Sequence, residues 1–263
     1  MLINAAFESG GIKGLAYLGA LKYLEERGIK IYQASGSSVG ALFASLVIAG
    51  YSYKEIYNEI ENVDIDTLLK RNNFINAIKN IGVNNIDNLE NKLNELLTKK
   101  GYYKFKDTKK GYDYLLKIAT TDYTSRKKVT LPDDYMLMGY NPDEQLISKA
   151  VAMSCSVPLF YSVYKYKEKM FGDGGILNKF PIDALNNKYP IFAFKISKSR
   201  PIYCFQGESD ESLRNRNIHV IKIDTCDINS LNFKKGLENR YLLYKNGYLA
   251  TKNYFEKYIN NVY

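Results

Sequence analysis

A five-residue motif, Gly36-Ser-Ser-Val-Gly40, constrains the fold of this chain more than any other feature. It matches the pattern Gly-x-Ser-x-Gly and lies between two apolar segments, residues 29–34 and 39–49. In this pattern a strand turns sharply into a helix, and the central serine is held in strained backbone geometry with its side chain exposed. The flanking positions must lack side chains because neighbouring chain passes close on both sides. The motif predicts that Ser38 lies at the end of a strand, facing the amino end of the next helix.

Strand and helix patterns alternate along the rest of the chain. Apolar strands are expected at residues 2–7, 29–34, 115–120, 191–196 and 218–223. Helices are expected at residues 15–27, 39–49, 145–153 and 237–258. This alternation predicts an α/β layer architecture with a largely parallel sheet.

The segment from residue 52 to residue 100 is polar and helical in pattern, and Ser52 and Glu55 have the spacing of a capping box at its start. The remaining strands are expected to be short: a hairpin at residues 129–131 and 135–138, and two strands within residues 161–171. Since there is no internal repeat, low-complexity linker or charge block, the chain is expected to form one domain over residues 1–263.

The composition is that of an ordinary globular protein. Hydrophobic residues make up 46% and charged residues 25%, which excludes a disordered or fibrous chain. The longest apolar run, residues 41–49, is about half of the roughly 20 residues that a membrane span needs. Residues 1–7 lead directly into a predicted strand, so no signal peptide is expected. The three distant cysteines fit reduced thiols in the cytoplasm better than a zinc ribbon or a disulfide framework.

The net charge is +9, from 37 Lys and Arg against 28 Asp and Glu. A basic protein favours acidic partners, such as nucleic acid or anionic lipid. The abundance of Lys, Asn, Ile and Tyr favours a plainer interpretation, a coding bias rather than a binding face. No nucleic-acid-binding motif is recognisable, and no nucleic-acid partner is expected.

One histidine, His219, is present in the whole sequence. Metal sites built on two or more histidines are therefore excluded, and no metal or organic cofactor is expected. The usual base for a serine in a Gly-x-Ser-x-Gly turn is a histidine late in the chain. His219, however, lies within the apolar strand at residues 218–223, where a structural role is favoured. A carboxylate is then required as the base.

Asp173 is the candidate carboxylate. It lies in Phe171-Gly-Asp-Gly-Gly175, directly after an apolar strand. The glycines would let backbone and substrate approach the carboxylate closely. The alternative is a solvated turn, because Asp-Gly is a common turn pair.

Three motifs together resemble the patatin-like phospholipases: Glu8-Ser-Gly-Gly-Ile-Lys-Gly14 after the first strand, the motif at 36–40, and Asp173-Gly-Gly175. The resemblance covers nearly the whole chain, since four further segments are similar to the family: residues 117–122, 150–160, 178–183 and 223–233. It implies a three-layer α/β/α fold with a mostly parallel central sheet. It also implies a catalytic Ser–Asp dyad without histidine.

The resemblance assigns a role to each motif. Ser38 would be the nucleophile and Asp173 the general base. The backbone N–H groups of Gly10 and Gly11 would form the oxyanion hole, with the N–H of Val39 as a further donor and Lys13 in support. The motif glycines are Gly14, Gly36, Gly40, Gly174 and Gly175.

The chain departs from the family pattern at Ser9, which replaces the first of three glycines that usually begin the first loop. A serine keeps its backbone N–H, so the oxyanion function survives, but the path of the loop is left open.

The implied activity is hydrolysis of fatty-acyl esters of phospholipids or other glycerolipids, of the phospholipase A or lysophospholipase type. The implied location is the cytoplasm, with peripheral contact to a membrane that holds the substrate. Residues 158–161 could line an acyl-chain groove or pack into the core. The basic and tyrosine side chains of the last helix could contact a membrane, although a solvated face packed by its tyrosines is favoured. Two alternatives remain: a soluble esterase or thioesterase, and a catalytically weak lipid-binding protein.

Overall fold

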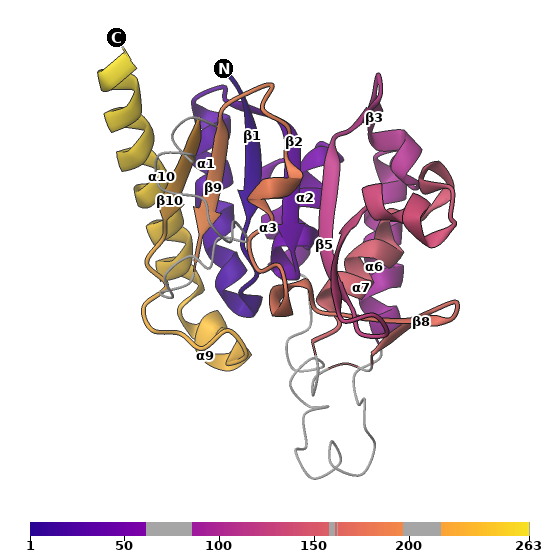
Figure 1. The fold of residues 1–263 in the computed structure, drawn as a ribbon. Coiled ribbons are helices and arrows are strands. Elements are labelled where there is room, and N and C mark those ends of the chain that lie inside the picture. Colours follow the sequence, from indigo (N-terminus) through magenta and orange to yellow (C-terminus); the bar gives the residue numbers. More distant parts are fainter. Residues whose placement is uncertain (62–85, 158–160, 162, 197–216, 263) are drawn as a thin grey trace.

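The computed structural model describes residues 1–61, 86–157, 161, 163–196 and 217–262. Within these residues one eight-stranded sheet crosses the molecule in the order β10-β9-β1-β2-β5-β8-β7, with β6 paired to β5 (Figure 1). Its strands are β1 (Leu2–Phe7), β2 (Lys30–Ser37), β5 (Leu116–Asp122), β6 (Lys127–Leu131), β7 (Tyr164–Tyr166), β8 (Lys169–Gly172), β9 (Ile191–Lys195) and β10 (Ile218–Lys222). Two further short strands, β3 (Lys109–Lys110) and β4 (Asp113–Tyr114), pair with each other.

Five neighbouring strands of the sheet, β10, β9, β1, β2 and β5, run parallel. The strands β6, β8 and β7 add to one side in antiparallel pairs. The α/β class with a mostly parallel central sheet is thereby confirmed. Since parallel strands end at the same edge, the segments that follow β1 and β2 meet there, and Phe7 pairs with Gly36 at the last step.

The helices are η1 (Gly11–Leu15), α1 (Ala16–Glu26), α2 (Val39–Ile48), α3 (Tyr53–Glu61), α6 (Ile86–Lys99), α7 (Ile147–Cys155), α9 (Phe233–Glu238) and α10 (Arg240–Val262). They share one large core with the strand residues on one face of the sheet, such as Ala5 and Phe7. The other face is covered by a smaller cluster in which Ala6 packs against Phe180 and Ile182. A short 3-10 helix, η6 (Ile182–Ala184), lies there.

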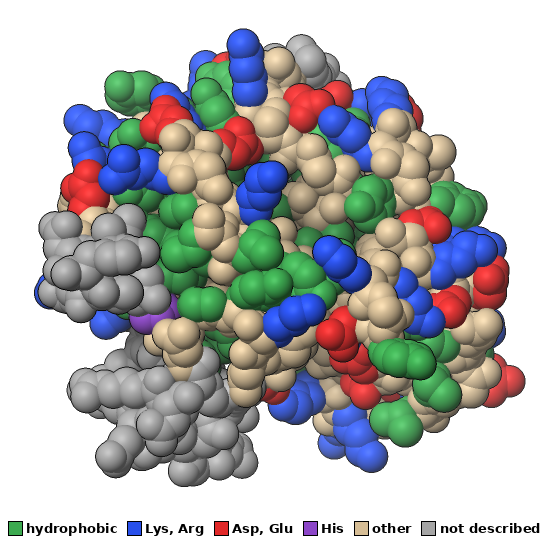
Figure 2. Space-filling view, turned by 90° about the horizontal axis from the view of Figure 1, so that it is seen from above, with side chains coloured by type: hydrophobic (Ala, Val, Ile, Leu, Met, Phe, Trp, Pro, Cys, Tyr) green, Lys and Arg blue, Asp and Glu red, His purple; other side chains and the backbone are tan. Residues whose placement is uncertain are grey.

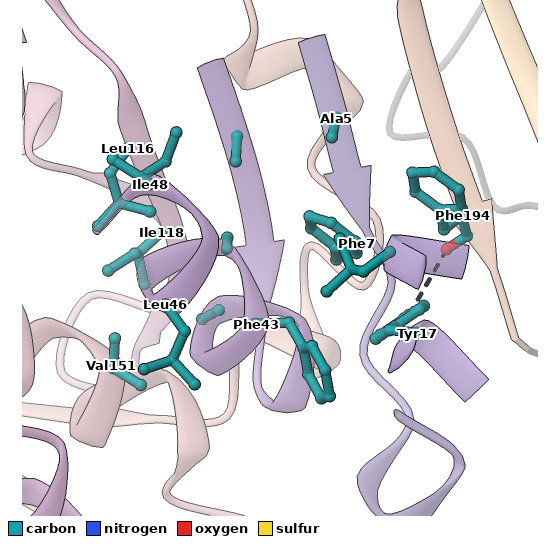
Figure 3. Close-up of a cluster of buried hydrophobic side chains, with 14 of the residues drawn as sticks. Ala5, Phe7, Tyr17, Phe43, Leu46, Ile48, Leu116, Ile118, Val151 and Phe194 are labelled. Atoms are coloured by element: carbon teal, nitrogen blue, oxygen red, sulfur yellow. Dashed lines mark hydrogen bonds between the residues drawn. The ribbon is translucent and has the colours of Figure 1, made fainter. Parts of the chain in front are cut away.

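The large core fixes the start of α1 and of α2 against the central strands. The Tyr17 ring packs edge-on against Phe7, with ring centroids 5.1 Å apart, and against Phe43, at 5.3 Å (Figure 3). Its buried hydroxyl donates to the carbonyl of Glu8 at 2.6 Å and lies 3.5 Å from that of Phe194. This packing holds the chain that follows β1 in register with the chain that follows β2.

Two local expectations are wrong. The strand β2 continues to Ser37, so the sharp turn is made by Ser38 alone. Residues 133–138 form a 3-10 helix, η3 (Asp133–Met138), and β6 pairs with β5 instead of forming the expected hairpin. The reason lies in a side chain: Asp134 accepts the backbone N–H of Thr130 at 2.6 Å and curls the chain back into a helical turn.

Two other expectations are confirmed. The Ser52 N–H donates to the Glu55 carboxylate at 2.8 Å, and the Glu55 N–H donates to the Ser52 hydroxyl at 3.2 Å, which is the capping box. The last helix, divided at Asn239 into α9 and α10, packs closely on α1. The rings of Tyr244, Tyr248 and Tyr254 contact those of Tyr57, Tyr23 and Phe192, whereas Tyr241 is 74% exposed.

The face that carries the amino ends of the parallel strands has mixed charge. Figure 2 shows Lys and Arg interspersed with Asp and Glu there, without an area of one sign. None of the described helices is long and apolar enough to cross a membrane. Within the same residues, no group of three His, Cys, Asp or Glu side chains could hold a metal ion.

Candidate active site

Ser38 occupies a strained backbone conformation, with φ 54° and ψ −124°, at the joint between β2 and α2. Such a conformation costs on the order of 1–3 kcal/mol in a non-glycine residue. A Cβ on Gly36 would lie 2.1 Å from the Gly40 carbonyl oxygen, and one on Gly40 would lie 2.2 Å from that of Phe7. The two glycines thus allow β1, β2 and α2 to approach closely enough to hold the turn.

Ser154 holds the same turn from α7. The backbone N–H of Ser38 donates to the Ser154 hydroxyl at 2.8 Å, and that hydroxyl donates to the Ala119 carbonyl at 2.6 Å. All three groups are buried. Sequence reasoning missed this role, although Ser154 lies in the segment at 150–160 that resembles the family.

Asp173 directly follows β8, and its backbone is fixed on both sides. Its N–H donates to the Ser156 carbonyl at 3.0 Å, and its own carbonyl accepts the Thr121 hydroxyl at 2.9 Å. The carboxylate atom Oδ1 accepts the Gly175 N–H at 2.7 Å. Asp173 is only 6% exposed, so the expected alternative of a solvated turn is excluded.

The electrostatics of Asp173 are dominated by burial. Desolvation raises the pKa of the carboxyl group, and interactions with the Ser38 hydroxyl, the Gly175 N–H and the Lys179 charge lower it by less. The second oxygen, Oδ2, is buried without a hydrogen bond of ordinary geometry to a described residue. The Ser38 hydroxyl is thus close enough to Asp173 to lower the pKa of its carboxyl group, without a hydrogen bond of ordinary geometry to Oδ2.

The loop between β1 and α1 brings two glycine N–H groups to this edge. Gly11 has φ +53°, and a Cβ there would lie 2.2 Å from the Ser230 carbonyl oxygen. The same oxygen accepts the Ile12 N–H at 3.0 Å. Within the described part of the chain, the N–H groups of Gly10 and Gly11 have no acceptor. They are available to a negatively charged oxygen.

Glu8 anchors the start of this loop and was not expected from the sequence. Its buried carboxylate accepts the Ile196 N–H at 2.7 Å and lies 3.8 Å from the Lys179 ammonium. The residue that departs from the family pattern, Ser9, donates its N–H to the Lys179 carbonyl at 2.9 Å. Its hydroxyl would lie 2.5 Å from a Cβ on Gly175, so the first loop packs directly on the Asp173 loop.

Two more glycines close the gaps between the three loops. A Cβ on Gly14 would lie 2.4 Å from Val39 Cγ2, which places η1 against the start of α2. One on Gly174 would lie 2.1 Å from the Ala119 carbonyl oxygen. The N–H of Val39 has no helical acceptor because α2 begins at this residue.

His219 lies far from these loops. It pairs with Phe192 in β9, which pairs with Ala5, which pairs with Ala34 in β2. Ser38 is four residues beyond Ala34 and three strands away from β10, which separates it from His219 by about 13 Å along the strands and about 14 Å across them.

The His219 ring has structural contacts. It stacks on Phe192, with centroids 4.7 Å apart, and its ring nitrogens lie 3.3 Å from the Tyr254 hydroxyl and 2.7 Å from Asn217 Oδ1. Burial lowers its pKa. These contacts fit the structural role that the sequence favoured.

Two further expectations concern Lys13 and the wall of an acyl-chain groove. Lys13 lies in η1 and is half-buried beside Gly10. Residues 158–160, the expected wall of an acyl-chain groove, lie outside the described residues, as does Cys204.

The family model for the patatin-like phospholipases matches residues 5–186, a span that contains all three loops. The chain belongs to this family.

Members and structural neighbours come from distant organisms. An uncharacterized protein, YqhO, of Bacillus subtilis is 36% identical over 195 residues, which cover 69% of this chain and 66% of that protein. The "Probable lipid hydrolase 463L" of Invertebrate iridescent virus 6 is 24% identical, over 66% of this chain and 60% of that one. The crystal structure of VipD from Legionella pneumophila shares the fold, with a TM-score of 0.62 at 18% identity, over 97% of this chain and 67% of that one. This patatin-like chain thus spans about two thirds of the length of these proteins.

Proposed function

We propose that this patatin-like protein is a lipid acyl hydrolase that cleaves fatty-acyl esters of phospholipids or other glycerolipids through a Ser38–Asp173 dyad. The observation that carries the proposal is a serine in strained geometry beside a buried aspartate whose Oδ2 is unengaged. Family membership and the name of the viral relative support the class of substrate. The phospholipase A or lysophospholipase type is part of the proposal.

The dyad works by proton transfer between two oxygens. The Ser38 hydroxyl attacks the ester carbonyl while Asp173 accepts its proton, and the alcohol of the lipid leaves with a proton from Asp173. A free aspartate, with a pKa near 3.9, is a weak base for a serine. Burial brings the pKa of Asp173 closer to what general-base catalysis at neutral pH requires.

The N–H groups of Gly10, Gly11 and Val39 are proposed to bind the oxyanion. The first two have no acceptor within the described residues, and the third begins α2. Removing one such donor typically reduces the rate by roughly 10²–10³-fold. The charge of Lys13 would add to this stabilisation.

A lipid surface fits the rim of the site. Four large apolar side chains are between 37% and 49% exposed on the segments that flank Asp173: Val163, Met170, Ile176 and Leu177. Apolar side chains with lysines beside them suit the interface of a bilayer. We propose that residues 1–263 act as one domain in the cytoplasm and meet the substrate at a membrane surface.

The rim distinguishes this proposal from its first alternative, a soluble esterase or thioesterase. Hydrolysis of phospholipid vesicles should fall several-fold in Ile176→Ser, while hydrolysis of a monomeric p-nitrophenyl ester stays within about twofold. Met136→Ser is the matched control, because Met136 is also exposed but lies in η3, outside this rim. Activity on the monomeric ester alone would favour the soluble esterase.

The second alternative, a catalytically weak lipid-binding protein, is tested by a fluorophosphonate probe. Labelling of wild-type protein at Ser38, together with no labelling of Ser38→Ala, supports a reactive nucleophile. Absence of labelling in the folded wild-type protein would reject the enzyme.

A further inference from the structure

The oxyanion loop, residues 8–12, is held in place by a part of the chain more than 200 residues away. The Ser230 carbonyl oxygen accepts the Ile12 N–H at 3.0 Å, and a Cβ on Gly11 would lie 2.2 Å from that same oxygen. Since the Ile12 N–H is taken, the N–H groups of Gly10 and Gly11 are the ones left in this loop without an acceptor among the described residues. The Ser230 carbonyl therefore fixes the backbone that carries both candidate oxyanion donors.

Side chains leave this backbone little freedom to move. A Cβ on Gly236, in α9, would lie 2.2 Å from Ile12 Cγ1, and one on Gly10 would lie 2.5 Å from Ile196 Cδ1. Figure 1 shows α9 near the carboxyl ends of β1 and β9, where the loop lies. The oxyanion loop is thus enclosed between the end of β9 and the segment that runs from Thr225 into α9.

Asn229 orients the carbonyl that holds the loop. Its side-chain oxygen, Oδ1, accepts the N–H of Leu231 at 2.9 Å. That N–H belongs to the same peptide unit as the Ser230 carbonyl, and in a planar trans peptide the two bonds point in opposite directions. The Asn229 side chain therefore holds one side of the peptide while Ile12 is held by the other. Asparagine commonly accepts the N–H two residues further on in this way.

The segment around Asn229 is itself anchored. Thr225 and Ile228 are each 2% exposed, and the Thr225 hydroxyl donates to the Ile196 carbonyl at 3.2 Å. The Asn232 N–H donates to the Asn229 carbonyl at 3.0 Å. All of these residues lie outside the span 5–186 that the family model matches. The oxyanion loop is within that span, but its support comes from beyond it.

We propose that Asn229 is a positioning residue of the oxyanion hole, which acts through the Ser230 carbonyl on the N–H groups of Gly10 and Gly11. This inference rests on the proposed function. Asn229 keeps the two donors directed at the oxygen that becomes negative during the reaction. Because that interaction is stronger in the transition state than in the bound ester, its weakening should lower kcat and leave KM nearly unchanged.

The first test compares three variants on a p-nitrophenyl fatty-acyl ester. In Asn229→Ala, kcat should fall by roughly tenfold, less than the 10²–10³-fold typical of a donor that is removed, with KM within about twofold. Asn229→Asp keeps an acceptor oxygen and should return kcat to within about twofold of wild type. Asn141→Ala is the matched control. Asn141 is also exposed and accepts the N–H two residues on, that of Asp143 at 3.0 Å, but it caps η4 (Pro142–Glu144) instead of supporting the oxyanion loop.

The second test reports on the donors directly. A fatty-acyl trifluoromethyl ketone adds to the Ser38 hydroxyl and gives a hemiketal whose oxygen is negative, as in the transition state. Its Ki should rise by roughly tenfold in Asn229→Ala, in parallel with the fall in kcat. The affinity for the matching ether lipid, which has no carbonyl group, should stay within about twofold of wild type.

Each other outcome overturns the inference. An unchanged kcat in Asn229→Ala, or an equal loss in Asn141→Ala, would show that Asn229 has no particular role in the oxyanion hole. A rise in KM at constant kcat, weaker binding of the ether lipid, or failure of Asn229→Asp to recover activity would assign it another role. If the wild-type protein is neither inhibited by the ketone nor labelled at Ser38 by a fluorophosphonate, the proposed function itself has failed, and this result is distinct from a failure of Asn229 alone.

Discussion

The two edges of the parallel sheet contain the two side chains that could act as a base, and they differ in almost every physical respect. At the amino edge, His219 stacks on Phe192 and its ring nitrogens lie near two partners. At the carboxyl edge, Ser38 has a positive φ and Asp173 Oδ2 is buried without a described partner. Strained backbone at a buried residue and an unpaired buried carboxylate oxygen are both more frequent at functional sites than elsewhere. The comparison therefore favours the carboxyl edge as the site of chemistry.

The largest difference between the two edges is expected when each candidate proton acceptor is replaced by an amide. We expect Asp173→Asn to reduce ester hydrolysis by about 10⁴-fold, because the amide cannot accept the Ser38 proton. His219→Gln should change it less than twofold. Initial rates with a p-nitrophenyl ester measure both, with circular dichroism as the check on folding. A large loss in folded His219→Gln would reverse the assignment.

Glycines at the two edges are expected to differ in how much an added Cβ lowers the free energy of unfolding. Gly40→Ala places a Cβ 2.2 Å from a backbone oxygen, so we expect it to lower the free energy of unfolding by more than about 3 kcal/mol or to prevent folding. Gly28→Ala meets no atom within 4 Å and carries only the strain of its φ of +62°, about 1 kcal/mol. Urea denaturation measures both. Similar losses at the two positions would contradict the close approach of β1 and α2.

The raised pKa of Asp173 predicts a trade-off between stability and activity. A carboxyl whose pKa is higher in the folded state stabilises the fold below about pH 3.9, and this contribution is lost as the pH rises through the folded pKa. At pH 7 the inactive Asp173→Asn should thus be more stable than wild type by roughly 0.5–2 kcal/mol, and the difference should shrink in acid. Thermal unfolding from pH 4 to pH 7 measures it. A variant less stable than wild type at pH 7 would show that burial of the charge is not the dominant effect.

The same pKa also sets the acid limb of the activity profile. Since the base must be ionised, kcat/KM should rise with pH through a pKa above the ordinary aspartate value of about 3.9. A profile that is flat down to pH 4 would argue against a buried base.

The smallest effect is expected at Ser154. Ser154→Ala leaves the Ser38 N–H without its acceptor and should lower kcat by roughly tenfold with little change in KM. Ser45→Ala is the matched control, because its hydroxyl donates to the Leu42 carbonyl within the same helix and not to the turn. Equal kcat values in the two variants would remove Ser154 from the support of Ser38.

The sequence predicted the central elements better than the periphery. The buried strand β1 is apolar at every position but Asn4, and its bounds at residues 2–7 followed from that pattern. The expected hairpin at 135–138 was wrong because a hydrogen bond from Thr130 to Asp134 overrides local strand propensity. Ser154 and Glu8 were missed as supports because their partners lie 116 and 188 residues away along the chain.

The sequence by itself determined where the backbone could bend and come close. The glycines around Ser38 and Asp173 meet a steric requirement that no other residue can meet. Their spacing can therefore be recognised from the sequence alone. Only the tertiary structure decided which groups face each other. Parallel pairing of β1, β2 and β5 brings Ser38 to one edge and leaves His219 at the other, and the antiparallel pairing of β8 with the end of β5 brings Asp173 to the edge of Ser38. Contact between distant segments depends on strand order and on packing against the shared core. The spacing of residues within a motif predicts neither of these.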